Sequence, residues 1–174
     1  LCVIVLGDES GYTTGEVQKM KLAAIESEWE TQPAPASFTL IGIPNQAEQR
    51  TDYAIKIPYA LGLIATRSID EPVIGLRDLA KHSEEHIQSG MIAYGALQKL
   101  KQGDTSDATR ALFDQHKQYL GYGLMLKQFT PNVTDATPEQ IKAAAKKTIP
   151  PVAPVFFSFR IMVFLGFLFV ATFV

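Results

Sequence analysis

The sequence predicts a mainly α-helical integral membrane protein, in which a long helical loop lies between two transmembrane helices. Val152 to Val174 is almost wholly apolar, and as a helix it would be roughly 34 Å long, enough to cross a hydrocarbon core of about 30 Å. Residues 1–7 are apolar but too short to span a bilayer, so we interpret them as the end of a preceding transmembrane helix. Because the chain lacks an initiator Met and stops within an apolar run, we expect an excerpt from a longer protein.

The residues between these ends, 8–151, form a polar loop without a basic excess. The chain has 16 Lys and Arg against 18 Asp and Glu, which gives a formal net charge of −2. Arg160 is the one charged residue outside the stretch 7–151. This balance gives no indication of a nucleic-acid partner. The single cysteine, Cys2, excludes a disulfide within the chain.

The first part of the loop, 8–74, is predicted to contain one helix and then irregular structure. Apolar residues recur at helical spacing over residues 15–30, and prolines follow directly. Turn-forming residues are frequent over 42–49. The apolar stretch 53–64 contains Pro58, which favours a broken segment over a continuous helix or strand.

The second part of the loop, 75–151, is predicted to be helical. We expect helices over 74–100, 106–128 and 138–147. A turn with Gly103 separates the first two, and Thr105 or Ser106 is expected to cap the second. The third begins with a capping box at Thr137, followed by Pro at the first helical position.

Two motifs in this part have alternative interpretations. His82-Ser83-Glu84-Glu85-His86 fits the H-x-x-E-H pattern of a class of zinc proteases, with both histidines on one helical face. A catalytic zinc needs a third protein ligand, and nothing in the sequence marks one, so we favour a solvated, charged helix face. Gly121-Tyr122-Gly123 lacks the third glycine and the preceding strand of a dinucleotide-binding motif, and we interpret it as a helix interruption.

Four residues are candidates for function, although each has an ordinary structural interpretation. Arg160 lies inside the apolar C-terminal segment, where a charge is expensive and usually has a partner, and the thioether of Met162 can bind haem iron. By pattern alone, Met162 would only pack and Arg160 would anchor the helix at the interface. Lys21 and Glu26 would lie on the wet side of a helix, pointing roughly 140° apart.

Several motifs follow one another along the chain in a fixed order. They are Gly7-Asp8-Glu9-Ser10-Gly11-Tyr12, Val17-Gln18-Lys19-Met20-Lys21-Leu22-Ala23-Ala24-Ile25-Glu26, Trp29-Glu30-Thr31-Gln32-Pro33-Ala34-Pro35, Ile57-Pro58-Tyr59-Ala60-Leu61-Gly62, Gly121-Tyr122-Gly123-Leu124, Thr130-Pro131-Asn132-Val133 and Phe159-Arg160-Ile161-Met162-Val163. With these motifs the chain resembles subunit I of the cytochrome bd-type quinol oxidases over nearly its whole length. The resemblance implies a periplasmic, hence extracytoplasmic, quinol-binding loop at 8–151, of which 75–151 is the extra stretch of the long-loop subfamily, followed by the transmembrane helix 152–174.

The resemblance also implies roles for individual residues. Lys21 and Glu26 match the family's quinol-site Lys and Glu. Met162 matches an axial ligand of the low-spin haem b, and Arg160 matches the Arg beside that haem. The other axial ligand, and the ligands of the high-spin haem b and haem d, would lie outside this sequence. The histidines that match none of these ligands are His82, His86 and His116.

We therefore expect part of a terminal respiratory oxidase, a quinol:oxygen oxidoreductase of the bacterial inner membrane. The full subunit would oxidise ubiquinol or menaquinol on the periplasmic side and pass electrons through haem b to haem d, where oxygen becomes water. Glu26 would accept a quinol proton, and Lys21 would hold a quinol oxygen. This chain alone would not be catalytic.

The expected partners are a second oxidase subunit and the lipid bilayer. Whether small accessory subunits also bind is an open alternative. The alternative, from another class of protein, is a noncatalytic membrane-anchored extracytoplasmic domain that binds a ligand or another protein. In that case Arg160 would be an interface anchor only.

Overall fold

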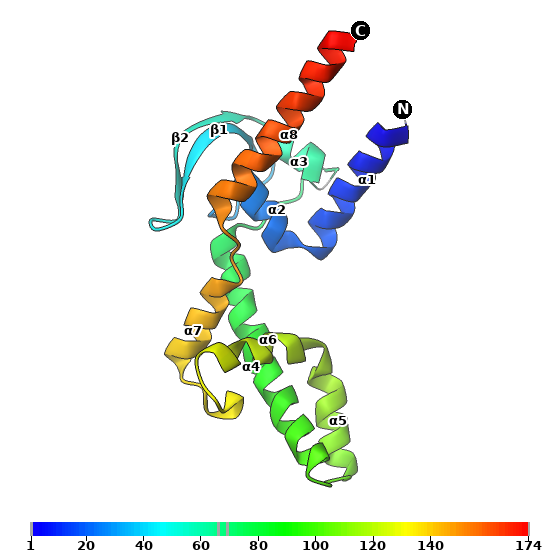
Figure 1. Ribbon diagram of the computed structural model, residues 1–174, viewed down its shortest axis with the longest axis vertical. Coiled ribbons are helices and arrows are strands. Elements are labelled where there is room, and N and C mark those ends of the chain that lie inside the picture. The colour runs from blue at the N-terminus through cyan, green and yellow to red at the C-terminus, as the bar shows by residue number, and fades with distance from the viewer. Residues whose placement is uncertain (1, 66, 69, 174) are drawn as a thin grey trace. The chain divides into compact units, whose positions relative to one another are not determined.

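The computed structural model describes residues 2–65, 67, 68 and 70–173, most of which are helical (Figure 1). The predicted mainly α fold class is confirmed. The chain divides into two compact units, one formed by Leu1–Leu79 with Ile149–Val174 and the other by Ala80–Thr148. The candidate site residues all belong to the first unit.

The stretch 15–30, which was predicted as one helix, instead contains the end of one helix and the whole of a second, shorter one. The first, α1 (Cys2–Val17), continues the opening apolar segment well beyond residue 7. The second, α2 (Lys19–Glu26), ends because Ser27 adopts a left-handed conformation with φ of 55°. The backbone N–H groups that follow α2 donate back to carbonyls of its last turn, in the pattern of a Schellman motif. The chain therefore turns directly after Glu26.

A β-hairpin, which the sequence pattern did not predict, follows α2. Strand β1 (Phe38–Asn45) pairs antiparallel with β2 (Arg50–Ile57), and in this register Thr39 lies opposite Lys56. The prediction of a turn-rich stretch over 42–49 was wrong for its first half, which is the end of β1. Gly and Pro there gave a turn signal, but a strand of a two-stranded sheet has a free edge, where both residues are tolerated.

The chain after the hairpin breaks at Pro58, as predicted, and continues as the short helix α3 (Ala60–Ala65). A small core joins α3 to the preceding segment; its buried members are Ala36, Leu61, Ala65 and Val73. This core supports the base of the hairpin.

Helix α4 (Leu76–Lys101) begins in the first unit and fixes the segment after α2. The backbone N–H of Leu76 donates to the carbonyl of Glu28 over 2.8 Å. A Cβ added to Gly75 would lie 2.3 Å from the carbonyl carbon of Glu30, so only glycine allows this close approach. The segment that carries Glu28 is thus held between α2 and the start of α4.

The second unit contains the predicted helices with one difference. The range 106–128 is not one helix: α5 (Asp107–His116) is capped by Ser106, and α6 (Leu120–Leu124) lies between two 3₁₀ turns, Lys117–Tyr119 and Met125–Gln128. The Gly121-Tyr122-Gly123 motif lies in α6 itself. A Cβ on Gly123 would lie 2.4 Å from the backbone of Gly90 on α4, so these two helices touch through glycine.

The capping box at Thr137 is present and begins α7 (Pro138–Lys147), as predicted. A further 3₁₀ turn, Val133–Asp135, precedes it. The core of this unit consists of Ile87, Leu126, Val133, Ile141, Ala144 and Ala145.

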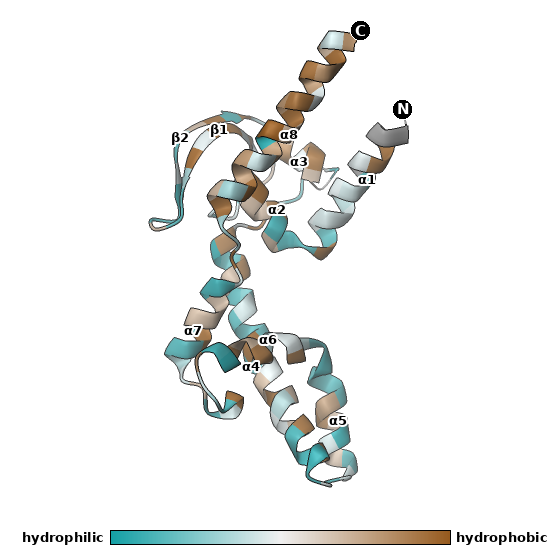
Figure 2. Ribbon diagram, viewed as in Figure 1, coloured by the Kyte–Doolittle hydropathy of each residue, from teal (hydrophilic) through white to brown (hydrophobic). Residues whose placement is uncertain are grey.

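The C-terminal helix α8 (Val152–Phe173) agrees with the predicted transmembrane helix. Among the described residues, one helical stretch, Pro138–Phe173, is long and apolar enough to cross a membrane, and its apolar part is α8. Figure 2 shows most of α8 in the hydrophobic colours. Helix α2 packs against α8 in the first unit.

Candidate functional site

A buried ion pair joins α2 to α8. Nη2 of Arg160 donates to Oε2 of Glu26 over 2.8 Å and to the carbonyl of Thr39 over 2.6 Å, while Nη1 donates to the carbonyl of Ile25. The Glu26 side chain is 4% exposed and that of Arg160 is 15% exposed. One guanidinium therefore binds the end of α2, the start of β1 and the candidate base at the same time.

Aromatic rings surround this guanidinium. Its central carbon lies 3.8 Å from the ring centre of Phe156, which is buried, and 5.1 Å from that of Phe38. The negative faces of such rings favour a cation, and the rings exclude water from it. Nε of Arg160 is also buried, and it has no hydrogen-bond partner in the part of the chain that the structure describes.

Burial raises the pKa of Glu26 to about 7, because a carboxylate away from water loses hydration. The Arg160 guanidinium acts in the opposite direction, and the nearby Glu28 carboxylate raises the pKa further. A carboxyl group with a pKa near neutrality can both accept and release a proton under physiological conditions.

The structure does not bring Lys21 to Glu26. Both residues lie on α2, which ends after Glu26 and not between them, and Lys21 is exposed whereas Glu26 is buried. The backbone N–H of Lys21 donates to the carbonyl of Gln18 over 2.9 Å, but its side chain makes no hydrogen bond or ion pair with another of the described residues. The two candidates therefore face different surroundings, as their five-residue spacing on a helix predicts.

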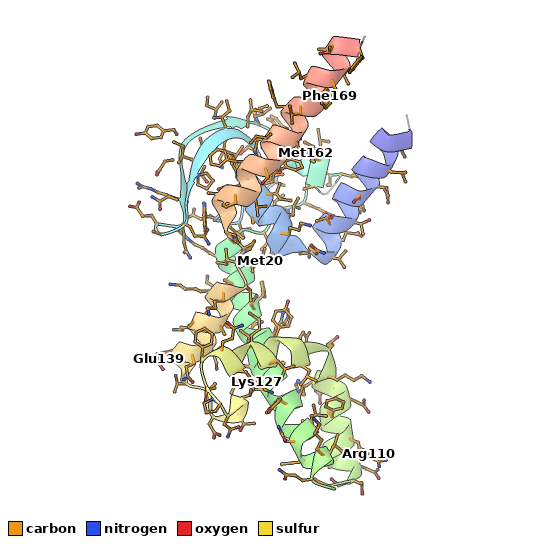
Figure 3. The ribbon with its side chains drawn as sticks, viewed as in Figure 1. Met20, Arg110, Lys127, Glu139, Met162 and Phe169 are labelled. Atoms are coloured by element: carbon orange, nitrogen blue, oxygen red, sulfur yellow. The ribbon has the colours of Figure 1, made fainter. Side chains whose placement is uncertain are left out.

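Met162 lies on α8 (Figure 3), two residues after Arg160 on the same helix. Two residues that are two positions apart on a helix differ by roughly 200° in rotation around its axis, so they point to nearly opposite sides. The Arg160 side chain accordingly enters the loop, whereas Met162 is 60% exposed. An exposed thioether on an apolar helix suits an axial iron ligand for a haem bound outside the described chain.

Glu28 is a buried carboxylate that was not among the predicted site residues. Its Oε1 accepts a hydrogen bond from Oγ1 of Thr39 over 3.2 Å and lies 3.5 Å from Nζ of Lys56, and its Oε2 accepts from the amide of Gln32. Its side chain is 4% exposed.

The spacing of three neighbouring acidic residues could have indicated that they do not share one exposed helix face. Glu26, Glu28 and Glu30 follow one another at intervals of two, and on one helix they could not all face water. That spacing indicates that the helix ends among them. In the structure only Glu30 is exposed.

A pocket of about 480 Å³ lies beside Glu28. Its lining includes Ser27, Glu28, Glu30, Gln32, Lys56 and Arg77. Glu28 forms part of its buried wall, and the Lys56 side chain, 40% exposed, reaches the solvent. The pocket therefore connects the buried carboxylate to water.

The histidines of the H-x-x-E-H motif lie on α4, in the second unit. Nδ1 of His82 is 3.8 Å from a carboxylate oxygen of Glu85, and His86 stacks on Tyr119 with ring centres 4.6 Å apart. Among the described residues, no group of three His, Cys, Asp or Glu side chains is placed to hold a metal ion. His116 is the last residue of α5.

Comparison with known proteins extends along the whole chain. Residues 1–174 match the family described as cytochrome bd terminal oxidase subunit I. Cytochrome bd-II ubiquinol oxidase subunit 1 of Escherichia coli K12 is 43% identical over 161 residues, which cover 92% of this chain and 31% of the relative. Cytochrome bd ubiquinol oxidase subunit 1 of Bacillus subtilis 168 is 33% identical over 70 residues, 40% of this chain and 15% of the relative. The chain thus spans less than a third of the length of either relative.

Proposed function

Because the chain belongs to the cytochrome bd terminal oxidase subunit I family, we propose that it forms the quinol-oxidising part of a respiratory oxidase in a bacterial inner membrane. The observation that carries the proposal is the buried carboxyl group of Glu26, with a pKa of about 7, held by Arg160 at the start of the apolar helix. Both relatives are named ubiquinol oxidases, which supports a quinol substrate.

The chemistry of quinol oxidation requires a base close to the membrane. A quinol loses two protons and two electrons, and its phenolic protons leave more readily when a carboxylate accepts a hydrogen bond from them. Glu26 is the base in this proposal. Among the described residues its carboxylate is bonded to Arg160 through Oε2, which leaves Oε1 for the quinol hydroxyl.

Arg160 keeps the base in place through the reaction. A guanidinium stays protonated at all relevant pH values, so it does not compete with Glu26 for the quinol proton. Its bonds to the carbonyls of Ile25 and Thr39 hold it whether Glu26 is charged or neutral. The position of the carboxyl group therefore survives each change of its charge.

Lys21 is the proposed donor to a quinol oxygen. It is exposed on the same short helix as Glu26, where an ammonium group can reach a bound ligand without losing much hydration. Its assignment rests on the family match of the surrounding motif, and we predict that it contributes to substrate binding more than to the chemical step.

Met162 would supply one axial ligand to the low-spin haem b. When bound in the full subunit, haems b and d would supply the electron-transfer chemistry for the reduction of oxygen to water. The ligands of the high-spin haem b and of haem d would lie outside this chain. The loop would face the periplasm, so the quinol protons would be released there, and a second subunit would complete the oxidase.

A reduced-minus-oxidised visible spectrum of the full-length subunit in its membrane tests the proposal against a noncatalytic binding domain. We expect haem b and haem d bands, and quinol-dependent oxygen uptake by the same membranes. Absence of these bands would support the noncatalytic alternative.

A further inference from the structure

The proton that Glu26 accepts needs a route to water. Glu26 is 3% exposed, so it cannot release a proton directly into the bulk solvent. We propose, on the basis of the proposed function, that Glu28 is the proton-exit residue of the quinol site and passes the proton to the pocket beside Lys56.

The first support is the turn between the two carboxylates. Ser27 is left-handed, and the Schellman hydrogen bonds close α2 there. The chain leaves the helix between Glu26 and Glu28, so residues only two apart in sequence can both be buried in the same region of the fold. Both of them are 3% exposed. Two carboxylates at such a spacing on a continuous helix would point to opposite sides.

Thr39 provides the second support, because it contacts both halves of the site. Its carbonyl accepts a hydrogen bond from Arg160, which binds Glu26, and its hydroxyl donates to Oε1 of Glu28 over 3.2 Å. One residue of β1 therefore fixes the two carboxylates relative to each other.

The pocket gives the third support. Glu28 lines a space of about 480 Å³ together with Lys56, whose side chain is 40% exposed. A carboxylate on the wall of a solvent-filled pocket can exchange a proton with water. Glu28 is thus placed between the buried base and the solvent.

The proposed step moves only a proton. The O–H bond of protonated Glu26 breaks while an O–H bond forms on Glu28, and Glu28 then gives its proton to water in the pocket. No electron is transferred in this step, and Glu26 returns to the carboxylate for the next quinol proton. No direct hydrogen bond joins the two carboxylates among the described residues, and the proposed transfer therefore uses a bridging water molecule.

Glu28→Gln in the full-length subunit of the assembled oxidase tests this role. We expect kcat for quinol oxidation to fall by at least about tenfold, less than the roughly 10²–10⁴-fold that a group acting directly on the substrate contributes. KM and the haem spectrum should change little, and the solvent deuterium isotope effect on kcat should increase.

Glu30→Gln is the matched control. Glu30 lines the same pocket but is exposed and paired with Arg77 at 2.6 Å, so this variant removes the same charge without removing the relay. We expect its kcat within about twofold of wild type, as for most surface changes. Equal kcat values in Glu28→Gln and Glu30→Gln would overturn the proposal.

A conservative variant separates proton transfer from packing. Glu28→Asp keeps a carboxylate and should have a higher kcat than Glu28→Gln. A purely structural role predicts the reverse order, because Gln keeps the shape of Glu and Asp does not. That reverse order would also overturn the proposal.

Two further outcomes are informative. A low kcat in Glu26→Gln together with a wild-type kcat in Glu28→Gln would leave the proposed function intact and show that Glu28 is not the proton-exit residue.

If the oxidase that carries Glu28→Gln does not assemble, the kcat of Lys56→Gln is measured instead. We expect a several-fold lower kcat there, because the cation at the pocket is lost, and an unchanged kcat would again overturn the proposal.

Discussion

Arg160 on α8 and Glu26 at the end of α2 form a buried ion pair with 2.8 Å between Nη2 and Oε2. The pair connects the apolar helix to the loop that carries the proposed base. Because Arg160 also binds two backbone carbonyls of the loop, any movement of the loop at this point must break several hydrogen bonds to a charged group. Each such bond typically contributes about 1.5–3 kcal/mol, so we expect this junction to be rigid.

The first prediction concerns the stability of the pair. Arg160→Met should destabilise the protein by about 3–5 kcal/mol, because it leaves the Glu26 charge buried without a partner. The double variant with Arg160→Met and Glu26→Gln should regain part of the lost stability, because the side chain left at position 26 is then neutral. The check is the thermal unfolding temperature of the assembled oxidase. Arg77→Met provides the comparison: it breaks the exposed pair with Glu30 and should cost under about 1 kcal/mol.

The second prediction is a pH dependence that belongs to Glu26. Its pKa is raised to about 7, so below that pH the group is increasingly protonated and cannot accept a quinol proton. The kcat/KM of quinol oxidation should therefore rise with pH through about 7 and level off above it. In Glu26→Gln the activity should be low and this acid limb should be absent. A wild-type pH profile in the variant would show that Glu26 is not the base.

The third prediction is that Lys21 binds substrate. Lys21→Ala removes a donor to a quinol oxygen and should lower kcat/KM between several-fold and about a hundredfold, mainly by raising KM. Lys19→Ala changes a neighbouring exposed lysine on the same helix and should stay within about twofold. If the two variants have the same quinol kinetics, Lys21 does not bind substrate and is only part of a solvated surface.

The fourth prediction concerns the haem ligand. Met162→Leu preserves volume and would cost under about 1.5 kcal/mol if the residue only packed. As an axial ligand, its loss should convert the low-spin haem b to high spin, which a visible spectrum of the reduced oxidase detects. Met20→Leu, a methionine on α2 (Figure 3), should leave the spectrum unchanged. Retention of the low-spin spectrum in Met162→Leu would remove the assignment.

The fifth prediction is that the histidines on α4 have no part in the reaction. Replacing His82 and His86 together by Ala should leave quinol oxidase turnover within about twofold, although the stacking of His86 on Tyr119 is lost. The check is turnover with and without a zinc chelator. A metal-dependent loss of activity in the double variant would revive the zinc hypothesis.

Part of the candidate site could not be predicted because it is made by residues far apart in the chain. Arg160 and Glu26 are 134 positions apart, and the sequence alone supported them only through the family resemblance. Glu28 was not among the predicted site residues. Its burial depends on Thr39 and Lys56, which face each other only when the hairpin forms. Strand pairing depends on such distant partners. The local pattern with Gly42 and Pro44 predicted a turn instead, and the strand was therefore missed.

The sequence by itself determined the features that depend on neighbouring residues. The apolar length of α8 and the capping box at Thr137 were predicted, and the N-cap of α5 was narrowed to Thr105 or Ser106, of which the structure has Ser106. A helix end is decided within a few positions, and a membrane span by one continuous segment. Only the tertiary structure decided which acidic residues are buried. That outcome depends on the left-handed turn at Ser27 and on the burial of Arg160, because a carboxylate leaves water only where other parts of the chain provide its partners.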